Sequence, residues 1–151
     1  MAGFVLFAAL ALAGCSPDAD HNPADVTFAQ RMIPHHRQAL TMSEKLPSDA
    51  DAPVTELARR IQAAQAPEID RLTGWLKEWG AFASGHEGMD HGMAPGTRAE
   101  WLKAMIEHHR GAVTMARDEL RDGAHVGAKQ LAQAIIDGQE AEIATMTKLL
   151  G

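Results

Sequence analysis

The chain has 151 residues, of which 46% are hydrophobic, and a formal net charge of −6 at pH 7. This length corresponds to one ordinary domain, which can bury a core without disulfide bonds. The acidic balance and the lack of clustered lysine and arginine exclude nucleic acid as a partner, because binding to phosphates requires such clusters.

The N-terminal segment has the features of a bacterial lipoprotein signal. The apolar run FVLFAALA is followed by LAGCS, which places the single cysteine, Cys15, at the position of lipidation, although the usual basic start is missing. The alternative, a short apolar helix of the fold, is too short to span a membrane. We expect residues 1–14 to be a signal peptide and residues 15–25 a polar tether. The mature protein would then lie in the bacterial cell envelope, on the periplasmic side, with a lipid anchor at Cys15.

Two helices are predicted in the first half of the chain. From about Val26 the apolar residues recur at intervals of three and four, as far as the break PSDADAP. A second helix follows, with Pro53 near its first turn and Gly80 as its stop. Pro34 and Pro67 fall inside these helices, where a proline costs about 3 kcal/mol or more. We expect each to kink a continuous helix, although Pro34 could instead start a new helix at the histidines that follow it.

The second half begins after a glycine-rich linker, residues 81–96. Thr97 and Glu100 have the spacing of a capping box, which opens a third helix. A fourth helix, from about Val126 to Leu150, closes the chain.

The two halves repeat each other. MIPHHRQALTM, residues 32–42, is identical to MIEHHRGAVTM, residues 105–115, at eight of eleven positions, and the second helix resembles the fourth. The repeated unit is a helical hairpin, residues 26–80 and again 97–150, whose apolar stripe cannot be buried alone. The sequence therefore predicts an all-α four-helix bundle with pseudo-twofold symmetry over residues 26–150.

Each repeat carries two adjacent histidines between two methionines. A spacing of three from Met32 places His35 in the apolar stripe of its helix, and His108 takes the same place in the other repeat. We expect His35 and His108 to point into the bundle. His36 and His109 are expected to flank the stripe.

The partner helices interrupt their apolar faces with a glutamine and a glutamate in each repeat. These are Gln65 and Glu68 in the second helix and Gln139 and Glu142 in the fourth. A buried carboxylate without a partner is costly, so we expect the histidines to be the partners. Such groups form either a polar network that fixes helix register or a metal site in which the glutamates orient the imidazoles, with direct ligation possible.

The methionines favour a metal site. Imidazole together with thioether suits copper, especially Cu(I), and four of the eight methionines bracket the histidine pairs. The linker adds His86, Met89, His91 and Met93 within eight residues, where core packing does not require methionine. We expect the protein to sequester copper outside the cytoplasm, where cysteine thiolates would be oxidised.

The duplicated M-I-x-H-H helix, followed each time by a Q-x-x-E-I helix, resembles the domain of unknown function 305 family over residues 26–150. The resemblance implies an exported, often lipid-anchored protein with a ferritin-like four-helix bundle. Because some members bind copper in the periplasm, it also implies a set of ligands from both repeats: Met32, His35, His36, Met42, Met105, His108, His109 and Met115.

Two other functions stay open. A structural or interaction module of the cell envelope, with a buried histidine–glutamate network, would explain the duplication but not the linker. A ferritin-like di-metal oxidase is the weaker alternative, because the Glu-x-x-His spacing is absent: Glu107 directly precedes His108, and Pro34 holds the equivalent position in the first repeat.

Overall fold

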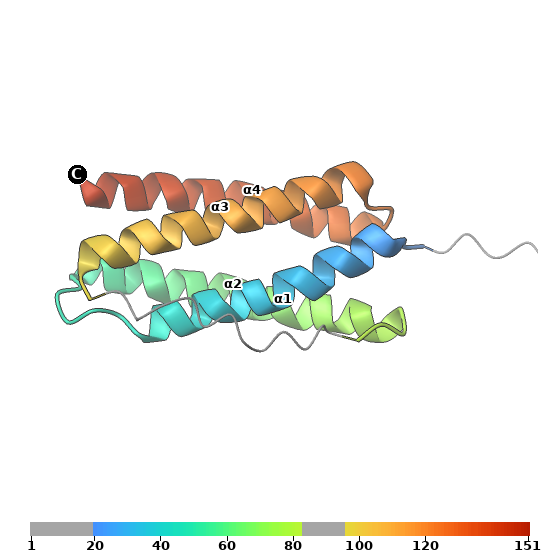
Figure 1. Cartoon of the computed structure of the whole chain (residues 1–151), viewed down its shortest axis with the longest axis horizontal. Helices are drawn as coiled ribbons and strands as arrows, with labels where there is room; N and C mark the ends of the chain where they lie inside the picture. Colours follow the sequence, from blue (N-terminus) through green and yellow to red (C-terminus); the bar gives the residue numbers. More distant parts are fainter. Residues whose placement is uncertain (1–19, 83–95) are drawn as a thin grey trace, which may run out of the picture.

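The structure, a computed structural model, describes residues 20–82 and 96–151, which form four α-helices. Helix α1 spans Pro23–Glu44, α2 Ala52–Glu78, α3 Arg98–Asp122 and α4 Val126–Leu150. The helices lie along one long axis as two hairpins, α1 with α2 and α3 with α4 (Figure 1). This confirms the predicted all-α bundle of two duplicated hairpins.

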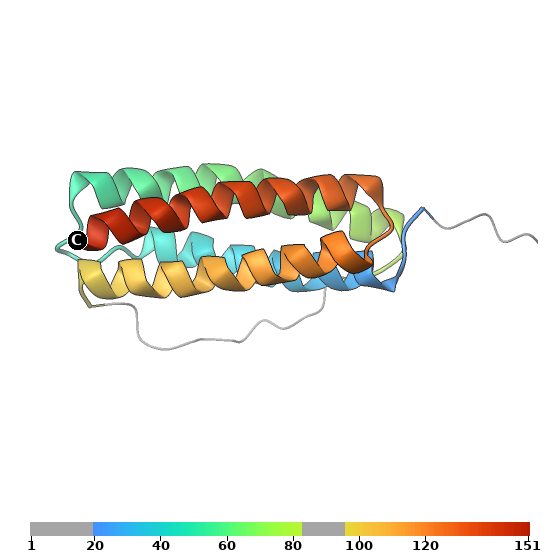
Figure 2. The ribbon, with the colours of Figure 1, turned by 90° about the horizontal axis from the view of Figure 1, so that it is seen from above.

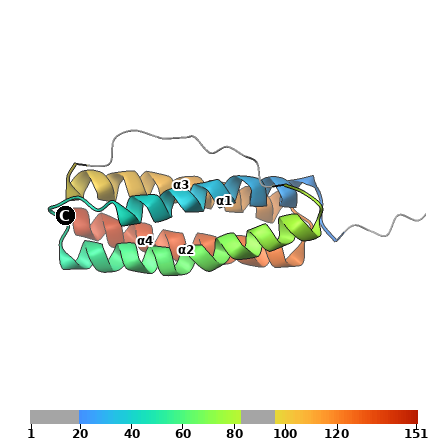
Figure 3. The ribbon, with the colours of Figure 1, turned by 90° about the horizontal axis from the view of Figure 1, so that it is seen from below.

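The two hairpins pack mainly through their first helices. Helix α1 lies against α3, whereas α2 and α4 approach each other less closely (Figures 2 and 3). Neighbouring helices run antiparallel throughout (Figure 1). The pseudo-twofold axis that relates the hairpins therefore passes between α1 and α3 on one side of the bundle and between α2 and α4 on the other.

Several sequence predictions lie outside the described residues. They are the signal peptide, the lipidation site Cys15 and the four linker donors His86, Met89, His91 and Met93. None of the helices within residues 20–82 and 96–151 is long and apolar enough to cross a membrane.

Helix α1 begins three residues earlier than predicted because Asn22 caps it. The Asn22 side chain accepts hydrogen bonds from N–H groups of the first turn, and Asp25 accepts one from the Asn22 N–H at 2.6 Å. The first turn of α1 thus occupies the end of the predicted tether. The predicted capping box of Thr97 and Glu100 is confirmed at the start of α3.

Both internal prolines lie within continuous helices, Pro34 in α1 and Pro67 in α2, so the alternative in which Pro34 starts a new helix is wrong. Helix α2 ends near the predicted stop. Gly80 adopts the left-handed conformation with φ 65°, which allows the Ala81 N–H to donate to the Leu76 carbonyl at 2.8 Å.

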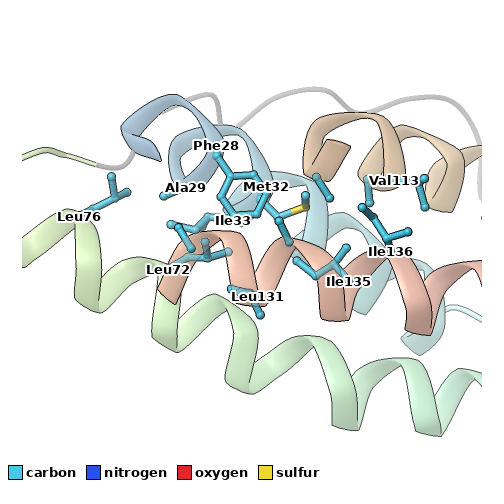
Figure 4. Close-up of a cluster of buried hydrophobic side chains, with 14 residues drawn as sticks. Phe28, Ala29, Met32, Ile33, Leu72, Leu76, Val113, Leu131, Ile135 and Ile136 are labelled. Carbon is cyan, nitrogen blue, oxygen red and sulfur yellow. The ribbon is translucent and has the colours of Figure 1, made fainter. Parts of the chain in front are cut away.

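The buried core consists of two apolar clusters. One surrounds Phe28, Met32, Leu72 and Ile135 (Figure 4), and the other surrounds Trp101. Between the clusters, each helix contributes polar side chains at mid-length. We call this set the polar layer, and it consists of His35, His36, Gln65, Glu68, His108, His109, Gln139 and Glu142.

Candidate metal centre

Two histidine–glutamate pairs form the centre of the polar layer. The Nε2 atom of His36 lies 2.7 Å from Oε2 of Glu68, and the Nε2 atom of His109 lies 2.8 Å from Oε2 of Glu142. Both imidazoles are fully buried, and each pair joins the two helices of one hairpin. The expected pairing of these histidines with the glutamates is therefore confirmed.

The glutamates determine which nitrogen of each imidazole carries the proton. A carboxylate only accepts hydrogen bonds, so Nε2 of His36 and of His109 must be the donor. In the neutral form of each ring the Nδ1 atom then presents a lone pair, and both Nδ1 atoms are buried with no hydrogen-bond partner in the described part of the chain. A carboxylate that fixes an imidazole in this way prepares its other nitrogen to bind a metal ion.

His35 and His108 form a second imidazole pair, where α1 meets α3. Their ring centroids are 3.7 Å apart, with a tilt of 34°. Gly111 leaves room for the His35 ring, since a Cβ at this position would lie 3.0 Å from His35 Nε2. The Nδ1 atoms of both rings and Nε2 of His108 are buried without a hydrogen-bond partner among the described residues.

These two imidazoles are neutral at neutral pH. Burial, followed by the proximity of the other histidines, lowers the pKa of His35 to about 4 and that of His108 to about 2. Their lone pairs are therefore available to a cation without prior loss of a proton.

The predicted orientation of the histidines is wrong. His36 and His109 are completely buried, whereas His35 and His108, which were expected to point inward, are half-buried at the α1–α3 junction. His36 follows Met32 by four residues, and this spacing also keeps two side chains on one face of a helix. The face that carries Met32 and His36 lies against the core.

The methionines divide into two groups. Met32 and Met105 are buried in the apolar clusters, one turn before His36 and His109 on the same helix faces.

Met42 and Met115 are half-buried, seven residues after His35 and His108 respectively. Seven residues of helix span about 10 Å. Because α1 and α3 are antiparallel (Figure 1), these two methionines lie on opposite sides of the His35–His108 pair. The eight expected ligands therefore cannot all reach one ion.

The two glutamines of the polar layer have amide oxygens without hydrogen-bond partners among the described residues. Gln65 and Gln139 are buried, and both amide atoms of Gln65 and Oε1 of Gln139 have no hydrogen-bond partner in residues 20–82 and 96–151. The same ranges contain no group of three or more His, Cys, Asp or Glu side chains placed to hold an ion. A metal at the polar layer would therefore need donors besides His, Cys, Asp and Glu, such as the thioethers of methionine or the amide oxygens of glutamine.

A pair of buried carboxyl side chains at the end of the bundle, Asp25 and Glu119, was not predicted from the sequence. Asp25 accepts hydrogen bonds from the N–H groups of Ala124 and His125, at 3.1 and 2.9 Å, and the Glu119 carboxyl lies near it, with both oxygens buried and without a hydrogen-bond partner among the described residues. Burial, followed by the proximity and negative charge of Asp25, raises the pKa of Glu119 to about 8. Burial alone would raise the pKa of Asp25, but these hydrogen bonds outweigh it and hold that pKa below its usual range.

The remaining described histidines serve packing and capping at the same end. The His21 ring stacks on Trp79 with centroids 4.7 Å apart, and His125 meets Trp79 edge-on at 5.2 Å. The Nδ1 atom of His125 also accepts a hydrogen bond from the Ala128 N–H and so caps α4. These contacts join three separate segments, so no local pattern predicted them.

The chain is similar to a known protein family and to several solved structures. The domain of unknown function (DUF305) matches residues 25–100 and 94–150. A DUF305 fragment from Deinococcus radiodurans is 30% identical, with a TM-score of 0.74, over 86% of this chain and 97% of that one. A DUF305 protein from Streptomyces coelicolor, named as secreted, is 34% identical, with a TM-score of 0.72, over 84% and 90%.

CopM in its Cu(II)-bound form is 29% identical, with a TM-score of 0.75, over 83% of this chain and 95% of that one. CopM structures with Cu(I) and with silver are also similar to this chain. A comparison with curated proteins gave no match.

Proposed function

This chain belongs to the domain of unknown function family DUF305, and from this premise we propose that it is a copper-binding protein that sequesters the ion outside the cytoplasm. One observation carries the proposal. The imidazoles of His36 and His109 are each held by a glutamate, and each leaves a buried Nδ1 atom without a partner in the described chain. Buried polar atoms without partners are rare, and a bound ion would account for them.

The available donors favour copper over harder ions. Neutral imidazoles of both repeats meet at the polar layer, and Met32 and Met105 share the inner helix faces with His36 and His109. Nitrogen and thioether donors select soft ions such as Cu(I). The Cu(I)- and silver-bound forms of CopM, a similar protein, support the same choice.

The location and the linker form part of the proposal. Lipidation of Cys15 would hold the bundle at the periplasmic side of the envelope. The secreted DUF305 protein from Streptomyces coelicolor supports a place outside the cytoplasm. His86, Met89, His91 and Met93 would supply further copper ligands in the linker.

A competitive Cu(I) titration tests the assignment to the polar layer. The double variant His36→Gln/His109→Gln should lose one bound ion per chain while its circular dichroism stays helical. The matched control is His21→Gln/His125→Gln, which removes two imidazoles at the end of the bundle and should keep the full stoichiometry. An unchanged stoichiometry in the first variant would contradict the assignment, and loss in a variant without the four linker donors alone would move the site to the linker.

The same titration distinguishes a structural role. The His36–Glu68 and His109–Glu142 pairs are also what a network that fixes helix register would contain. If the His36→Gln/His109→Gln variant unfolds without copper, and the variant His35→Gln/His108→Gln folds and binds copper normally, then the polar layer serves packing alone.

A further inference from the structure

A small pocket lies between α2 and α4, on the side of the bundle away from the His35–His108 pair. Its volume is about 50 Å³. Small residues of both helices, including Ala64, Ala134 and Gly138, leave the space open. The polar lining consists of Gln65, Glu68, Gln139 and Glu142, two residues from each helix around the pseudo-twofold axis.

Two carboxylates face this pocket without a basic side chain to balance them. Glu68 and Glu142 each use Oε2 to accept a hydrogen bond from a histidine, and neither pairs with lysine or arginine within residues 20–82 and 96–151. Their side chains are one-fifth exposed, so solvent screens them only in part. Two such charges beside one small cavity attract a cation.

The glutamines supply an independent reason for a ligand. Gln65 is 2% exposed and Gln139 4% exposed, and the amide oxygen of each has no hydrogen-bond partner in the described chain. An unsatisfied buried polar group costs about 1–3 kcal/mol. Because both glutamines line the pocket, a ligand there that accepts electron pairs would satisfy both oxygens.

We propose that the pocket between α2 and α4 binds one divalent cation of the hard, oxygen-preferring class, such as Mn²⁺. The carboxylates of Glu68 and Glu142 and the amide oxygens of Gln65 and Gln139 are the ligands. All four are oxygen donors, which hard cations prefer, whereas copper favours the imidazoles and thioethers. The volume leaves space for the ion and a few waters. Glu68 and Glu142 also hold the imidazoles of the copper proposal through Oε2, but no imidazole or thioether is a ligand of this second ion.

The test is a titration of the protein with Mn²⁺, in which binding is measured as the loss of the electron paramagnetic resonance signal of the free ion. We expect one saturable site per chain. Gln65→Leu/Gln139→Leu removes both amide oxygens and should weaken Mn²⁺ binding about tenfold or more, while the variant stays as stable as the parent or becomes more stable. Gln130→Leu, an exposed glutamine of α4, is the matched control and should bind as the parent does.

Two further variants keep the result interpretable. Gln65→Met/Gln139→Met preserves side-chain length without the oxygens and replaces the leucine variant if that variant does not fold. His35→Gln/His108→Gln should bind Mn²⁺ normally, which separates this site from the copper proposal. Absence of saturable binding up to about 1 mM Mn²⁺, or equal binding by the parent and the glutamine double variants, would overturn the proposal.

Discussion

The buried carboxyl pair of Asp25 and Glu119 makes the stability of this bundle depend on pH in a direction that a single substitution tests. Glu119 is 1% exposed, and its carboxyl oxygens have no hydrogen-bond partner among the described residues, so burial near the Asp25 carboxylate favours the protonated form. Glu119→Gln keeps the shape of the side chain and stays uncharged, but it removes the proton that titrates.

The magnitude follows from the two pKa values of Glu119. The folded protein holds the proton up to about pH 8, whereas the unfolded chain releases it near 4.5. Between these values the folded state binds one more proton, so the free energy of unfolding falls as the pH rises, by about 1.4 kcal/mol for each pH unit. Over the whole window this amounts to as much as roughly 5 kcal/mol, a large share of the stability of a typical domain.

The effect is measured by urea denaturation at pH values from about 5 to 9, with circular dichroism as the signal. The difference in unfolding free energy between Glu119→Gln and the parent should grow in favour of the variant as the pH rises to about 8 and then level off. Glu78→Gln, at an exposed position of α2, should show no such trend. Parallel curves for the parent and Glu119→Gln would refute the reasoning, because they would mean that Glu119 is not protonated in the folded state.

Three further predictions follow from single contacts. Gly111→Ala places a Cβ 3.0 Å from His35 Nε2, so Cu(I) affinity should fall about tenfold in a competition titration while helix stability rises. Trp101→Phe removes the hydrogen bond from Nε1 to the Met42 carbonyl and leaves a void, so urea denaturation should record a loss of about 2 kcal/mol. Asn22→Ala removes the cap of α1 and should cost about 1 kcal/mol, seen as a Tm lower by roughly 2–4 °C.

The helices could be predicted from the sequence because their ends carry strong local signals. Thr97 with Glu100 and the glycine at position 80 marked helix ends that the structure reproduces. The start of α1 was missed for a local reason. Asn22, Pro23 and Asp25 form a capping box inside a polar segment that otherwise has the composition of a tether.

The orientation of the histidines could not be decided from Met32 alone. Each helical residue turns about 100°, so His36 lies about 40° from Met32 around the helix axis and His35 about 60° on the other side. Both positions are compatible with an inward side chain. His36 is the buried one of the two because it forms a hydrogen bond with Glu68 of α2, a contact that the sequence of α1 alone does not show.

Following the buried positions along the whole helix, and not from Met32 alone, would have distinguished His36 from His35 and would also have identified Asp25 and Glu119 as buried. The buried positions of α1 include 25, 29, 32, 36, 39 and 43, with alternating spacings of four and three. In α3 the same alternation gives 102, 105, 109, 112, 116 and 119. These two series contain Asp25, His36, His109 and Glu119. The two histidines pair with glutamates of α2 and α4, and the two carboxyl side chains lie near each other at the end of the bundle.

The two repeats agree at the polar layer and differ at the ends of the bundle. The repeats of α1 and α3 are offset by 73 residues, as from Met32 to Met105, so Asp25 corresponds to Arg98 and Glu119 to Leu46. The buried carboxyl pair therefore exists once, whereas the His–Glu pairs and the buried glutamines exist twice.

Packing does not require the polar groups at mid-length of the helices, because replacing a buried ionic pair with apolar side chains often leaves the stability of a protein unchanged or increases it. Equivalent groups that face each other across a pseudo-twofold axis can bind one ligand on that axis from both sides. The imidazoles of His35 and His108 meet at one end of this axis, and the pocket between α2 and α4 lies at the other. For this reason we assign ion binding to the polar layer, and we assign the single carboxyl pair to stability.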